Sequence, residues 1–94
     1  MAAAGGGAEG AGLHVVVLSP EATVYEGEAT QVVAPASNGY LGILRGHAPL
    51  MALLGEGVLR VENGRDSRKF NVAGGFLQVV DDVVTVLSER AAAA

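Results

Sequence analysis

Short apolar segments separated by turn residues run through most of the chain. Five of them are rich in β-branched or aromatic residues and end in turn residues, which is typical of half-buried strands: Leu13 to Leu18, Ala29 to Ala34, Ser67 to Ala73, Phe76 to Val80 and Val83 to Ser88. In a sixth segment, Val58 to Glu62, Leu59 and Val61 share one face, whereas Val58, Arg60 and Glu62 share the other, which faces water. This pattern predicts strands.

Turn residues indicate how these strands connect. Asn63-Gly64 is a strong hairpin signal because both residues accept positive φ, and it predicts an antiparallel pair between Val58 to Glu62 and Ser67 to Ala73. Asp81-Asp82 predicts a second tight turn, and a third hairpin is expected near Gly55 to Gly57. Pro49 to Leu54 fits either a strand or a short helix, because proline suits a first helical position and glycine a helix end.

The architecture that follows is all-β. No long segment has its apolar residues at helical spacing, so the strands and turns favour an antiparallel sandwich or a small barrel. Val15 to Leu18 and Val83-Val84 are apolar on both faces, so their strands are either central in the core or covered by a partner. We therefore expect a chain that binds protein.

Composition narrows the class of protein. The 94 residues allow one domain, 50% apolar residues favour a folded chain, and no apolar run is long enough to span a membrane. The absence of cysteine excludes disulfides, thiolate catalysis and cysteine-ligated metals, and a net charge of -4 argues against nucleic-acid or anionic membrane surfaces.

The ends of the chain are poor in large side chains. Ten of the first twelve residues are Ala or Gly, so we expect residues 1–12 to be a flexible tail without the features of a secretory signal. The predicted domain is 13–90, and Ala91 to Ala94 are expected to fray.

The sequence contains no recognisable catalytic, cofactor or metal site. His14 and His47 lack metal-ligand spacing, the serines lack a nucleophile-elbow motif, and Asp81-Asp82 is explained by a turn. The glycines at Gly39 to Gly42 and at Gly74-Gly75 lack the lysine and helix of a phosphate loop. His47 is either an interface hydrogen-bonding or pH-sensitive residue or a loop histidine packed on its own domain. We predict a chain that is not an enzyme and holds no cofactor.

The stretch Ser37 to Leu50, SNGYLGILRGHAPL, resembles the signature of the epsilon subunit of the rotary ATP synthase F1 sector. Other pieces follow in the family's order, namely Leu18-Ser19-Pro20-Glu21, Tyr25-Glu26-Gly27-Glu28, Gly57 to Val61, Gly74-Gly75-Phe76 and Val84 to Leu87. Together they cover the whole predicted domain, from Leu13 to Arg90.

The resemblance implies a flattened antiparallel β-sandwich of about eight to ten short strands, in which Pro49 to Leu54 is a strand. It implies a non-catalytic rotor subunit that links the gamma subunit to the polar loops of the c-ring and couples proton translocation to ATP synthesis. Such a subunit is peripheral, at the cytoplasmic face of the bacterial plasma membrane, and does not insert into lipid. The alternative is a free-standing sandwich that binds a small ligand or peptide at its glycine loops.

The resemblance also implies two sets of contact residues. Asn38, Gly39, Tyr40 and Leu41 are expected at the c-ring, and the residues expected at gamma are Ser19, His47, Pro49, Leu50 and Leu53. The family often has an acidic or polar residue at the position of Tyr40 and proline at that of Arg45, so the c-ring contact here is expected to use ring stacking and a cation. Relatives continue after a segment like Leu87 to Arg90 into two helices that carry an inhibitory switch. This chain is therefore expected to assemble into the rotor and to support coupling, without inhibiting the ATPase activity of F1.

Overall fold

The computed structural model describes residues 12–64 and 66–94, and every regular element in them is a strand. The strands are β2 (Leu13–Leu18), β3 (Thr23–Ala29), β4 (Gln31–Ala36), β5 (Gly39–Leu44), β6 (Leu50–Leu53), β7 (Gly57–Asn63), β8 (Asp66–Val80) and β9 (Val83–Ala93). Among these residues there is no helix that is long and apolar enough to cross a membrane. The predicted all-β class is confirmed.

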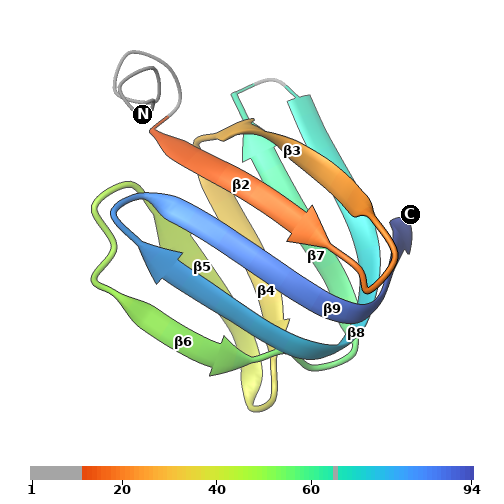
Figure 1. Ribbon diagram of the computed structural model, residues 1–94. Helices are drawn as coiled ribbons and strands as arrows, with labels where there is room; N and C mark the ends of the chain where they lie inside the picture. The colour runs from red at the N-terminus through yellow and green to blue at the C-terminus, as the bar shows by residue number, and fades with distance from the viewer. Residues whose placement is uncertain (1–11, 65) are drawn as a thin grey trace.

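One sheet folds over itself to make two layers. Its strand order is β3-β2-β9-β8-β7-β4-β5, and β6 pairs with β8 outside this path. Figure 1 shows β2, β9 and β6 in one layer and β4, β5 and β7 in the other. The first half of β8 pairs with β7, whereas Phe76 to Val79 pair with β6. β8 therefore belongs to both layers.

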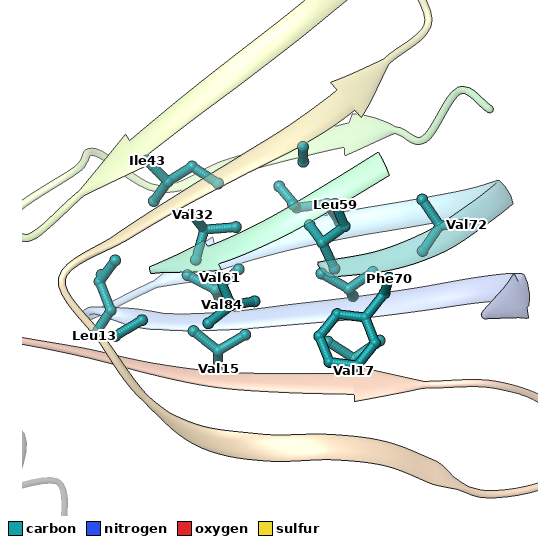
Figure 2. Close-up of a cluster of buried hydrophobic side chains, with 14 of the residues drawn as sticks. Leu13, Val15, Val17, Val32, Ile43, Leu59, Val61, Phe70, Val72 and Val84 are labelled. Atoms are coloured by element: carbon teal, nitrogen blue, oxygen red, sulfur yellow. The ribbon is translucent and has the colours of Figure 1, made fainter. Parts of the chain in front are cut away.

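The inward side chains of both layers form one apolar core (Figure 2). Leu13, Val15 and Val17 of β2 are fully buried, as are Val32 and Leu59 of the opposite layer. Each is followed along its strand by a residue that is more exposed, as the alternation of a pleated strand requires. The core thus accounts for the β-branched composition of the strands.

Two predicted hairpins are confirmed. β7 and β8 pair with Asn63 opposite Asp66, and Gly64 between them has a φ of +64°. β8 and β9 pair with Val80 opposite Val83, and both Asp81 and Asp82 have positive φ. Positive φ at both central residues is typical of a type I′ turn, whose twist matches that of the two paired strands.

Other predicted connections were wrong. No hairpin forms at Gly55 to Gly57, because β6 pairs with β8 while β7 pairs with β4 and β8. The expected strand Ala29 to Ala34 spans a break at Thr30, where the backbone N–H donates to the Glu62 carbonyl instead of continuing the β2–β3 ladder. Ser67 to Ala73 and Phe76 to Val80 belong to one long strand, β8.

The sheet is not wholly antiparallel. β2 pairs in parallel with β9, with Val15 opposite Val84 and Val17 opposite Val86. These strands come from opposite ends of the chain, so no turn motif joins them. Pro49 to Leu54 is resolved in favour of a strand, which spans Leu50–Leu53.

The ends of the folded part differ from the prediction. Ala91 to Ala93 continue β9 opposite Phe70 to Val72, and the Ala94 N–H donates to the Lys69 carbonyl, so this end is not frayed. Pairing with a long neighbouring strand supplies the hydrogen bonds that the small side chains do not predict. Gly12 is buried against the side chain of Arg45. The rest of the predicted flexible tail, residues 1–11, lies outside the described residues.

Candidate functional site

One outer face of the sandwich is largely apolar. It is formed by outward residues of β2, β6, β9 and the second half of β8, and we call it the apolar face: Val16, Leu18, Met51, Leu53, Phe76, Val80, Val83 and Leu87. Leu53, Phe76, Leu87 and Leu18 stand in register across four neighbouring strands. Leu53 is 67% exposed and Met51 is 65% exposed. Gln78 and Thr85 lie between Met51 and Val16, so the continuous apolar part of this face is the row from Leu53 to Leu18. An exposed apolar row of this kind is typical of a site where another molecule binds.

A shallow groove crosses one end of the apolar face. Its volume is about 490 Å³, and it is lined mainly by Pro20, Leu53, Phe76 and Leu87, with Gly75 at the bend of β8. The groove is open and contains few polar groups, so it suits an apolar side chain of a protein partner better than a polar metabolite.

The opposite outer face carries polar and basic residues. We call it the mixed face; it comprises the outward residues of β4, β5, β7 and the first half of β8, including Tyr40, Val58, Arg60, Glu62 and Lys69. Arg60 and Glu62 form an exposed ion pair with 3.5 Å between Nη2 and Oε2. The two outer faces therefore differ in the chemistry they offer to a partner.

Tyr40 lies across the mixed face. Its side chain is on β5 opposite Pro35 of β4, and its hydroxyl accepts a long hydrogen bond of 3.5 Å from the backbone N–H of Val58 on β7. The ring is still 63% exposed. Gly57 leaves space for this arrangement, because a Cβ there would lie 2.7 Å from the hydroxyl oxygen. Tyr40 is thus an aromatic surface residue held in a defined position.

The residues predicted for the c-ring lie together at the β4–β5 turn. Asn38 is exposed in the turn, and Gly39, the first residue of β5, is also exposed and has a φ of +131°. Tyr40 follows at the start of β5, whereas Leu41 packs partly against the core. Figure 1 shows this turn projecting from the lower end of the sandwich. Asn38 and Tyr40 are therefore available to a partner, and Leu41 supports the turn from within.

The residues predicted for gamma are more dispersed. Leu53 is on the apolar face, and Ser19 lies near the same end, in the β2–β3 turn, where its Oγ accepts the N–H of Ala22 at 3.2 Å. His47 and Pro49 precede β6 at its other end, and Nδ1 of His47 donates to the Ala48 carbonyl at 2.7 Å. Leu50 packs partly against the core.

Sequence reasoning missed most of the apolar face as a site. Met51, Val80 and Leu87 were not predicted as contact residues, and Phe76 was named only within a strand and within the family motif Gly74-Gly75-Phe76. A signal was present, because Val83-Val84 and Val15 to Leu18 are apolar on both faces of their strands. Assigning the outward members to one surface requires the pairing of β2 with β9 and of β6 with β8.

A small charged cluster lies at the β2 rim of the apolar face. Nδ1 of His14 is 3.0 Å from Oε2 of Glu28, and Nε2 is 2.9 Å from Oε2 of Glu26. The hydrogen bond with Glu28, followed by that with Glu26, raises the pKa of His14 above 6.5 despite partial desolvation. The two carboxylates contact different ring nitrogens, and no group of three acidic, histidine or cysteine residues within 12–64 and 66–94 is arranged to hold a metal ion.

Comparison with known proteins places the chain in a family. Residues 12–94 match the family described as ATP synthase, Delta/Epsilon chain, beta-sandwich domain. The ATP synthase epsilon chain of Leptospira borgpetersenii is 45% identical over 80 residues, which are 85% of this chain and 63% of that protein. The epsilon chain of Nostoc is 47% identical over 77 residues, 80% of this chain and 56% of that protein. The chain thus spans about three fifths of the length of these curated relatives.

Two solved structures share the fold. One is the Euglena gracilis mitochondrial ATP synthase with OSCP, F1 and c-ring, matched with a TM-score of 0.81 at 23% identity over 88% of this chain and 54% of that one. The other is the central stalk and c-ring of the Tetrahymena thermophila enzyme, with a TM-score of 0.72 at 17% identity over 86% of this chain and 66% of that one. From the family match and the curated relatives together, we conclude that this chain belongs to the ATP synthase delta/epsilon family and contains the beta-sandwich domain of that family.

Proposed function

We propose that this chain is a non-catalytic rotor subunit of a rotary ATP synthase, which links the gamma subunit to the c-ring and so couples proton translocation to ATP synthesis. Membership of the delta/epsilon family supports this function. The observation that carries it is the contrast between the two outer faces, since a linking subunit needs a separate binding surface for each of its two partners.

Gamma binds the apolar face in this proposal. Permanent subunit contacts are the more apolar class of interface, and Leu53, Met51 and Phe76 are the exposed anchors that such a contact would bury. Ser19 lies at the same end of the face as Leu53, while His47 and Pro49 extend the contact beyond the other end of β6. Leu50 contributes by fixing β6 to the core.

The c-ring binds the β4–β5 turn. Asn38 and Gly39 offer backbone and amide groups, and Tyr40 offers an aromatic ring that lines one hollow with Arg60. Arg60 takes the place of the cation expected from Arg45, which packs on Gly12 beyond the other end of β5. Polar loops are bound well by such a combination, because a tyrosine ring gives contact area and still forms hydrogen bonds. In this arrangement the subunit sits in a membrane-associated complex, peripherally and at the cytoplasmic face of a bacterial plasma membrane, without inserting into lipid.

The alternative of ligand binding at the glycine loops receives less support. A Cβ on Gly74 would lie 2.8 Å from a carboxylate oxygen of Glu89, and one on Gly75 would overlap the Leu87 carbonyl. These glycines therefore serve the close approach of β8 to β9 rather than an open loop. We retain the rotor subunit as the proposed function.

The test is calorimetric binding of purified gamma to the full chain and to two matched variants. Leu53→Ser removes an anchor from the apolar face, and Leu44→Ser removes a leucine of similar exposure, 56% against 67%, from β5. We expect Leu53→Ser to weaken binding at least tenfold, about 1.4 kcal/mol, and Leu44→Ser to change it less than threefold. Absence of wild-type binding at micromolar concentrations would contradict the function. Equal losses in both variants would contradict the assignment of gamma to the apolar face.

A further inference from the structure

His14 is hydrogen-bonded through both of its ring nitrogens to carboxylates of the edge strand β3. Its partners are Glu28 at Nδ1, 3.0 Å away, and Glu26 at Nε2, 2.9 Å away. A neutral imidazole has one N–H and one lone pair, so it can donate to only one of these carboxylates. Both contacts are hydrogen bonds only when the ring carries two protons. The arrangement is therefore that of an imidazolium between two anions.

Among the described residues, the hydrogen bond from His14 is the one that the side chain of Glu28 accepts. Its second oxygen, Oε1, is buried and has no hydrogen-bond partner among the residues that the structure describes. After deprotonation at Nε2, the lone pair of that nitrogen would face the carboxylate of Glu26, and the two would repel each other. The proton on Nε2 is thus the element that joins Glu26 to the cluster.

Neighbouring elements supply no second cation in contact with the carboxylates, as far as the described residues extend. On β9, Val83 stands opposite His14 and Thr85 follows on the same face. In the β8–β9 turn, the Asp82 carbonyl accepts the His14 N–H, and the Asp82 carboxylate accepts the Gly46 N–H at 2.7 Å. Arg45 packs on Gly12. Within 12–64 and 66–94, the ion pairs of Glu26 and Glu28 are those with His14.

β3 is an edge strand, so its attachment is limited. It pairs with β2 alone and stands at the end of the strand order. Its inward anchors are the buried Ala29 and Tyr25, whose ring lies 5.4 Å from that of Phe70 and 5.7 Å from the guanidinium carbon of Arg68. Its outward anchors are Glu26 and Glu28, which reach His14. A change in the protonation of His14 therefore affects the attachment of β3 more directly than that of any strand in the other layer.

We propose that His14 is a protonation-dependent clamp, in which the imidazolium fastens edge strand β3 to β2 and loss of its proton releases Glu26 and loosens β3. This property goes beyond the proposed function and does not depend on it. The hydrogen bonds to Glu28 and Glu26 raise the pKa of His14, so the clamp is closed well below pH 6.5 and opens as the pH rises through the higher pKa of the folded protein.

Amide hydrogen exchange of the full chain tests the clamp. Protection factors, which correct for the intrinsic pH dependence of exchange, are measured by NMR near pH 6 and near pH 9. We expect the β2–β3 ladder to lose protection severalfold at the higher pH while the β7–β8 ladder keeps it. In His14→Gln this pH dependence should vanish, and in the control His47→Gln it should remain. Persistence of the β3 effect in His14→Gln, or no effect in the wild type, would overturn the proposal.

A second measurement does not require the His14 variant to fold. The imidazole resonances of His14 are titrated in the wild type, in Glu26→Gln and in Glu28→Gln. We expect a wild-type midpoint above 6.5 with both ring nitrogens protonated below it, and a lower midpoint in each variant, with the larger decrease in Glu28→Gln. A wild-type midpoint at or below 6.5, or one that neither substitution changes, would overturn the clamp.

Discussion

Gly75 of β8 lies so close to Leu87 of β9 that a Cβ on Gly75 would be 1.9 Å from the Leu87 carbonyl oxygen. Gly75 also has a φ of +102°, which L side chains rarely adopt. The close approach occurs where β8 passes from one layer to the other, next to the row of Phe76 and Leu87. The bend that builds the apolar face therefore requires glycine.

Gly75→Ala should destabilise the fold strongly. The methyl group meets backbone atoms, which move only with the strand, and the positive φ adds strain. We expect a loss of about 2–4 kcal/mol in the free energy of unfolding, measured by urea denaturation. Gly42→Ala is the matched control, because Gly42 is also in a strand and its nearest neighbour is a flexible Gln31 side chain at 4.0 Å. Equal losses in the two variants would contradict the role assigned to the Gly75–Leu87 approach.

Tyr40→Ala should weaken attachment to the c-ring without unfolding the domain. An exposed aromatic anchor contributes about 1–3 kcal/mol to binding, whereas removal of an exposed side chain changes stability by about 0.5 kcal/mol. Binding is measured by co-sedimentation with purified c-ring, and stability by thermal denaturation.

Tyr40→Phe separates the ring from the hydroxyl. The phenylalanine keeps the exposed ring but loses the long hydrogen bond to the Val58 N–H. We expect most of the c-ring affinity to be retained. If Tyr40→Ala lost stability and binding to the same degree, Tyr40 would be a packing residue of the mixed face and not a contact for the c-ring.

Asp82→Ala should destabilise the hairpin between β8 and β9. Asp82 has a φ of +62°, and its carboxylate accepts the Gly46 N–H at 2.7 Å. Alanine tolerates this φ poorly and offers no acceptor, so we expect a loss of about 1–2 kcal/mol. Asparagine also tolerates a positive φ and keeps an acceptor oxygen, so the free energy of unfolding of Asp82→Asn should stay within about 0.5 kcal/mol of the wild type. Urea denaturation at neutral pH compares the three proteins, and a similar loss in both variants would rule out this explanation.

The stability of the wild type relative to His14→Gln should depend on pH. The folded protein has the higher His14 pKa, so it binds the proton more tightly than the unfolded chain does. The contribution is therefore complete only well below pH 6.5 and disappears as the pH rises through the folded pKa. His14 is 36% exposed, so we expect a difference below about 1 kcal/mol. Chemical denaturation from pH 6 to pH 9 measures it, and a difference that grows with pH would contradict the assigned direction.

Local sequence determined the strands and the tight turns. Leu13 to Leu18 is a strand as predicted, and the alternation in Val58 to Glu62 places Leu59 and Val61 in the core. Asn63-Gly64 and Asp81-Asp82 mark hairpins because these residue types accept positive φ. Such features depend on neighbours along the chain, which is the information that a sequence pattern contains. The motif from Ser37 to Leu50 is likewise a local pattern, and together with the other short motifs in the same order along the chain it indicates the family.

Only the tertiary structure decided which strands meet. The parallel pairing of β2 with β9, the attachment of β6 to β8 and the ordering of Ala91 to Ala93 all join segments that are distant in sequence. Long-range pairing is selected by burial of the whole core, to which each strand contributes only an apolar stripe. The apolar face and the contacts of His14 with Glu26 and Glu28 are consequences of that pairing. They arise because outward residues of separate strands become neighbours only after the core has formed.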